Sequence, residues 1–190
     1  MLILIAGLIL FFIPHSVSIV NEPWRNRMAA RLGEQRWQGL YSLVALAGFI
    51  LIIWGYGLAR ADAAVVYTPA AGLRHLAWLL MLPVFPLLIA TYAPGRLRTA
   101  TKHPMLLATL LWSAAHLLVN GNLPDLLLFG TFFLWALADR ISMTQRTQRP
   151  LQELPPSRFN DLIAIAAGLG LYLAFLFGVH GWLIGVPLLR

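Results

Sequence analysis

The chain has 190 residues, of which 59% are hydrophobic and 11% charged, whereas about a quarter of the residues of an ordinary soluble domain are charged. This balance excludes a soluble globular fold and indicates an integral membrane protein. The net charge of +7 is spread over several loops, which argues against nucleic acid as a partner and favours the lipid bilayer surface. The absence of cysteine excludes disulfides, thiolate nucleophiles and Cys-ligated metal centres.

Six apolar stretches are long enough, or nearly so, to cross a bilayer, because a spanning helix needs about 20 apolar residues. They predict an all-α, polytopic integral membrane helix bundle formed by a single domain over residues 1–190. In chain order, the expected spans are Leu2 to Val20, Leu40 to Leu58, Leu73 to Tyr92, Met105 to Val119, Leu123 to Ala138 and Leu162 to Leu189.

The segment after the first span predicts a separate interfacial helix. It runs from Asn21 to Leu32, with Pro23 in its first turn and Gly33 after its end. Trp24 and Met28 share one face, so this helix is expected to lie on anionic lipid.

The remaining connections also have recognisable signals. Asn120-Gly121-Asn122 predicts a tight turn between the fourth and fifth spans. The proline-containing segment 144–158 predicts a solvated cytoplasmic loop. The glycines of the last span predict close helix–helix contacts, and the final two form a small-xxx-small pair; they are Gly168, Gly170, Gly178, Gly181 and Gly185.

The basic residues predict the orientation. Of the fourteen Lys and Arg residues, all but Arg60, Arg74 and Arg190 follow the first, third or fifth span. Cytoplasmic loops collect positive charge, so both termini are expected on the non-cytoplasmic side of the membrane. The alternative of a cleaved signal peptide is disfavoured because no basic residue precedes Arg25.

Histidines within the spans are the first candidates for a site, because polar groups in lipid are costly. His15 lies in the first span, and His103 begins the fourth at the same expected membrane depth. Deeper in the fourth span, Trp112, His116 and Asn120 align at i, i+4 and i+8. That face could present an imidazole to a ligand within the bundle, or His116 could simply hydrogen bond to a neighbouring helix.

The acidic residues exclude several chemistries. They form no paired-carboxylate site and no zinc or di-iron motif. Only Asp139, beside Arg140 at the end of the fifth span, is expected to be paired in place. The spans also lack the internal charged groups that usually mark an ion path, which argues against transport.

Short motifs along residues 1–140 carry a family resemblance. They are Pro14-His15-Ser16, Arg31-Leu32-Gly33, Arg36, Tyr41-Ser42-Leu43, His103-Pro104, Leu111-Trp112, Ala115-His116-Leu117-Leu118, Asn120-Gly121 and Leu128-Phe129-Gly130. Their order and spacing resemble the NnrU family of bacterial membrane proteins. The resemblance implies a role in nitric oxide metabolism and denitrification.

The resemblance also implies a cofactor. Plant zeta-carotene isomerase contains a similar domain, binds haem b through histidines and acts on a carbon–carbon double bond when the iron is ferrous. By this resemblance His15 is the leading candidate iron ligand. The plant enzyme has further histidines near the end of the span that corresponds to Phe129–Asp139, where this chain has none. His103 is therefore our choice for the second ligand, and redox-dependent isomerisation of an apolar substrate is one expected activity.

Two alternatives stay open, as does the question of whether the protein is an enzyme. The protein could be a non-catalytic partner or assembly factor for a nitrogen-oxide reductase. It could bind another membrane protein or form a homo-oligomer. Lys102-His103-Pro104-Met105 is also similar to a segment of membrane isoprenylcysteine and phospholipid methyltransferases. Here leucine and alanine follow in place of their aromatic residue and glycine, and their acidic stretch near the C-terminus is missing.

Overall fold

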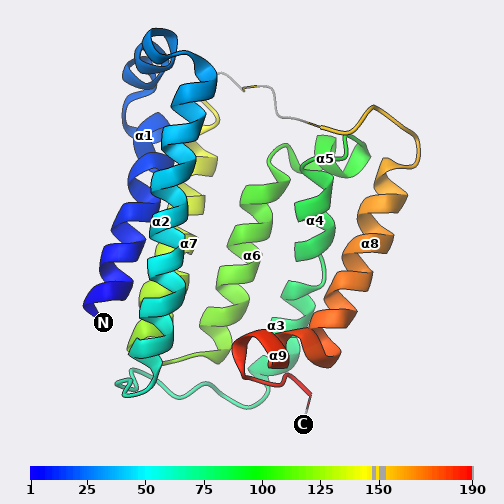
Figure 1. Cartoon of the computed structure of the whole chain (residues 1–190). Helices are drawn as coiled ribbons and strands as arrows, with labels where there is room; N and C mark the ends of the chain where they lie inside the picture. The colour runs from blue at the N-terminus through cyan, green and yellow to red at the C-terminus, as the bar shows by residue number, and fades with distance from the viewer. Residues whose placement is uncertain (147–148, 150–152, 190) are drawn as a thin grey trace. The chain divides into compact units, whose positions relative to one another are not determined.

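The computed structural model describes residues 1–146, 149 and 153–189, and these are all-helical (Figure 1). Within them, four helices are long and apolar enough to cross a membrane: Leu2–Leu32, Glu34–Arg60, Leu73–Ala90 and Asn160–Ile184. Pro104–Val119 is a shorter apolar helix. The expected membrane helix bundle is therefore confirmed as a class, while the count of six spans and the side of the termini stay predictions.

The helices fall into two compact units. Their bounds are α1 (Leu2–Leu32), α2 (Glu34–Arg60), α3 (Leu73–Met81), α4 (Val84–Ala90), α5 (Arg96–Thr101), α6 (Pro104–Val119), α7 (Leu123–Ser142), α8 (Asn160–Ala174), the π-helical η1 (Phe175–Val179) and α9 (His180–Ile184). Unit 1 comprises Met1–Pro69 and Asn120–Thr147, and unit 2 comprises Ala70–Val119 and Gln148–Arg190.

The predicted break after the first span lies at Asn21, inside α1. Asn21 has non-helical torsion angles (φ −152°, ψ 77°), and its Oδ1 accepts a hydrogen bond from the backbone N–H of Trp24 at 2.9 Å. This is the bond by which an N-cap residue satisfies a free donor of a helix. Gly33, with φ 85°, ends the helix in a conformation that side chains disfavour. The predicted helix is confirmed, and its position on lipid stays a prediction.

In unit 1, α1 and α2 pack so closely that glycine is required between them. A Cβ added to Gly48 would collide with the backbone of Phe11, and one added to Gly55 would collide with the backbone of Leu4. Gly7 of α1 meets the backbone of α2 in the same way. Such contacts between backbones are the usual reason for small residues at membrane helix interfaces. α7 packs against both helices and completes the unit (Figure 1).

A buried carboxylate fixes the start of α7. Asp125 is only 2% exposed and accepts a hydrogen bond from the Tyr56 hydroxyl at 2.6 Å. It also forms a capping box with Asn122, in which each residue satisfies a backbone donor of the other. The predicted turn at 120–122 is confirmed, because these three residues alone connect α6 to α7. Val65 forms an isolated antiparallel β-bridge with Asn122.

In unit 2, α4 packs against α6 and α8, and α3 packs against α6. The expected third span is interrupted at Leu82 and Pro83, so it forms two helices. A Cβ added to Gly168 of α8 would collide with the backbone of Pro86, which confirms the predicted close contact at this glycine. Tyr172 donates its hydroxyl to the carbonyl of Trp78 at 3.2 Å.

The prediction that Gly181 and Gly185 form a packing pair is wrong. Gly185 has φ 77° and is the left-handed C-cap of α9, a position that glycine favours because it has no Cβ. Nothing lies within 4 Å of a Cβ added there. Gly185 therefore ends the last helix instead of packing against a neighbour, and the helical part of the expected span Leu162 to Leu189 stops at Ile184.

Candidate functional site

His15 lies among four aromatic rings of unit 1. Its imidazole stacks on Phe11 with ring centroids 4.2 Å apart and meets Tyr41 and Trp135 edge-on at 5.0 and 5.7 Å. Phe12 is 6.4 Å away, also edge-on. We call these five residues the His15 cluster. Because they come from α1, α2 and α7, the cluster depends on the packing of all three helices of the unit.

A bond to its own helix orients the His15 ring. Nδ1 lies 2.6 Å from the carbonyl oxygen of Phe11. A carbonyl oxygen only accepts, so Nδ1 carries the proton and, in the neutral ring, Nε2 keeps the lone pair. Histidines that bind metals are usually oriented by such a bond from the other ring nitrogen. The arrangement therefore suits Nε2 of His15 as a ligand atom.

Next to the cluster, α7 and the turn after it contribute buried donor atoms that have no acceptor. Within the described residues, Trp135 Nε1, Arg140 Nη1 and Arg146 Nε are shut off from solvent and have no hydrogen-bond partner. Buried polar groups without a partner are rare, and each calls for an explanation. The sequence alone does not reveal these donors, because their burial depends on the packing around α7.

The expectation that only Asp139 among the acids is paired in place is wrong. Asp139 does form an ion pair, with Arg146. However, Glu34 pairs with Arg25 at 2.5 Å, and Asp125 is held by Tyr56 and the capping box.

His116 belongs to unit 2 and has the same kind of local bond as His15. Its Nδ1 lies 2.8 Å from the carbonyl oxygen of Trp112, and the two rings are 5.2 Å apart, so their predicted alignment on α6 is confirmed. The His116 ring stacks over that of His180 at 6.5 Å. Asn120, the third residue of the expected face, offers its carbonyl to the Tyr67 hydroxyl at 2.9 Å.

His103 directly precedes Pro104, the first residue of α6, as the sequence predicts. It lies in unit 2 and His15 lies in unit 1, so their joint binding of one iron stays a prediction. Among the described residues, no group of three or more histidines or acids could hold a metal ion. A haem iron needs only one or two protein ligands, so a single oriented imidazole can be sufficient protein ligation for haem.

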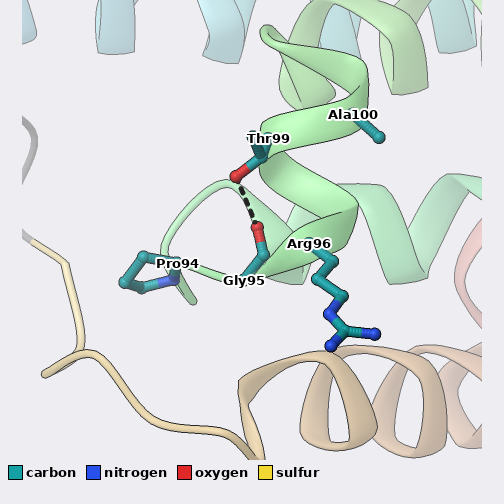
Figure 2. A pocket seen from close by; sticks show the side chains of 5 residues that line it. All are labelled: Pro94, Gly95, Arg96, Thr99 and Ala100. Carbon is teal, nitrogen blue, oxygen red and sulfur yellow. Dashed lines mark hydrogen bonds between the residues drawn. The ribbon is translucent and has the colours of Figure 1, made fainter.

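A shallow depression in unit 2 does not involve any of these residues. Figure 2 shows its lining, which consists of Pro94, Gly95, Arg96, Thr99 and Ala100. Thr99 donates its hydroxyl to the carbonyl of Gly95 at 3.0 Å. The carboxylate of Asp161 accepts from the backbone N–H groups of Arg96 and Leu97 at 2.9 and 3.0 Å. The protein itself thus satisfies the start of α5, and this region joins α5 to α8.

Together, the helices and the His15 cluster define an all-helical membrane protein with an oriented imidazole in an aromatic setting. The family model described as NnrU protein matches residues 3–188. The chain therefore belongs to the NnrU family, and the match extends well beyond the 1–140 region in which the motifs lie. No curated protein and no solved structure matches the chain.

Proposed function

We propose that this member of the NnrU family binds haem b in unit 1 and that His15 would hold its iron. The observation that carries the proposal is the bond from Nδ1 to Phe11, which leaves Nε2 as the ligand nitrogen. The residues present also fit the rest of the group. Aromatic side chains of the His15 cluster suit an apolar macrocycle, and the unpartnered donors of residues 135–146 suit its acidic substituents.

In this proposal each part of the site has a distinct task. The Phe11 carbonyl holds the imidazole plane and raises the basicity of Nε2. Tyr41 and Trp135, from α2 and α7, flank the ring and exclude water. The bound iron would supply the redox chemistry. Turnover of nitrogen oxides in the bacterial inner membrane and redox-dependent isomerisation of an apolar substrate are the activities that we propose for such a site.

Replacing His15 with alanine is expected to abolish or strongly shift the Soret band of protein purified from haem-replete cells. The reason is that the substitution removes the nitrogen that would hold the iron while leaving the aromatic rings in place. The measurement is an absorption spectrum in the ferric and dithionite-reduced states, with haem quantified by pyridine haemochrome.

The matched control is His116→Ala, because His116 makes the same bond to its own helix but lies in unit 2. This variant should keep the wild-type Soret band. Added imidazole should restore the band in a His15→Gly variant, since it can occupy the vacated space. A colourless wild-type preparation, or a normal spectrum in His15→Ala, would refute the proposal.

A further inference from the structure

We infer that the C-terminal part of α7 and the turn after it form a binding site for a carboxylate, with Trp135 and Arg140 on the helix and Arg146 in the turn, beside the His15 cluster. The inference deepens the proposed function, and it rests on that function only where haem is named as the source of the carboxylate. Three buried donors without an acceptor, on one segment of twelve residues from 135 to 146, carry it.

The first step is that these donors need an acceptor. Each of the three atoms is buried, and a buried donor without a hydrogen bond keeps the full cost of its desolvation. Nothing in the part of the chain that the structure describes accepts from them. A ligand oxygen would therefore remove an existing penalty as it binds.

The second step concerns charge. Asp139 forms an ion pair with Arg146, but Arg140 has no carboxylate partner among the described residues. Even the paired Arg146 side chain, which is 11% exposed, has an Nε without an acceptor. The segment therefore carries an excess of partly buried positive charge, and burying a charge is costly unless it is compensated. A negatively charged ligand group supplies that compensation.

The third step identifies the kind of molecule. Trp135 joins two environments, because its ring contacts Phe12 at 5.4 Å and His15 at 5.7 Å while its Nε1 has no acceptor. A guanidinium fork matches the two oxygens of a carboxylate better than a single oxygen. The fitting ligand is thus an amphiphile with an apolar body against the His15 cluster and a carboxylate toward the arginines. The propionates of haem and the headgroup of a fatty acid share this chemistry.

The test compares ligands with and without a free carboxylate on the full-length protein in detergent. We expect ferric haem b to bind at least about tenfold more tightly than its dimethyl ester, because a hydrogen-bonded charge is lost on esterification. We also expect 1-pyrenebutyrate to bind more tightly than the uncharged 1-pyrenebutanol. Arg140→Met should remove both preferences, and Trp135→Phe, which keeps the ring but not the N–H, should reduce them.

The control is Arg27→Gln, which removes the same charge from an exposed position of unit 1 and should keep both preferences. Ligand-free Arg140→Met should also melt at or above the wild-type temperature, since it loses a partly buried charge whose Nη1 has no acceptor. Equal binding of acid and ester, or a lower melting temperature of Arg140→Met, would overturn the inference.

The outcomes also separate this inference from the haem proposal. Haem binding that depends on His15 but is equal for the ester would overturn only the carboxylate site. Binding of pyrenebutyrate that depends on Arg140, in a protein that binds no haem, would support the carboxylate site and refute the haem proposal. Competition by phosphatidylglycerol but not by oleate would overturn the inference by showing that a lipid phosphate is the natural acceptor.

Discussion

Replacing Gly55 of α2 with leucine is expected to destabilise unit 1 by about 3 kcal/mol. Even a Cβ at this position would collide with the backbone of Leu4. The collision involves main chain, so a change of rotamer cannot relieve it, and α1 would have to move away from α2. Unfolding in detergent by increasing SDS, followed by circular dichroism, measures the change in the free energy of unfolding.

The matched control for this prediction is Gly57→Leu. Gly57 lies on the same helix, is exposed, and has nothing within 4 Å of an added Cβ. Because leucine favours helix more than glycine does, this variant should be neutral or slightly more stable. A similar loss of stability in both variants would show that the substitution acts through helix propensity or the detergent and not through the α1–α2 contact.

Asp125→Ala should also cost about 3 kcal/mol, because it removes the acceptor of a buried hydroxyl and half of the α7 capping box. Tyr56 would then be left with its hydroxyl beside an apolar methyl group, and the backbone N–H of Asn122 would lose its acceptor. Thermal unfolding in detergent, followed by tryptophan fluorescence, should report the lower stability.

A double-mutant cycle separates the two contributions of Asp125. Tyr56→Phe alone should cost less than Asp125→Ala, because the capping box survives it. The double variant should be more stable than the sum of the two effects predicts, since the residues are in direct contact. Asp62→Ala, at an exposed position, should change little. Strict additivity would contradict the importance of the Tyr56–Asp125 bond.

Much of the fold could be predicted because its signals are local. Asparagine and proline at the start of a helix, and glycine after its end, act within a few residues, so the break at Asn21 and the end at Gly33 were foreseeable. The apolar spans follow from length and hydropathy in the same way. The turn at 120–122 has the same local character.

Contacts between residues that are far apart in the sequence could not be predicted in this way. Tyr56 and Asp125 are 69 residues apart in sequence, so the partner of the carboxylate is invisible until α2 and α7 are packed. A glycine in the sequence can end a helix or allow close packing, and the sequence does not distinguish these roles. The torsion angle shows that Gly185 ends a helix, and the contact with Pro86 shows that Gly168 packs against a neighbour.

One part of the candidate site could be predicted from the sequence and the other could not. His15 could be selected from the sequence, because an imidazole inside a span is costly and stands out. Trp135, Arg140 and Arg146 could not, because tryptophan and arginine at the end of a membrane helix are ordinary. Their significance comes from burial without an acceptor, which is a property of the packed helices.

Unit 1 is built from two separate segments of the sequence, which affects how it assembles during synthesis. Unit 1 is interrupted by Ala70–Val119, and at about 5–20 residues per second the ribosome needs several seconds to make that stretch. During this delay the nascent hairpin of α1 and α2 exists without α7, and Tyr56 has no carboxylate to bind. The interval in which an insertase or chaperone can hold this half-built intermediate is therefore set by the length of the interrupting segment.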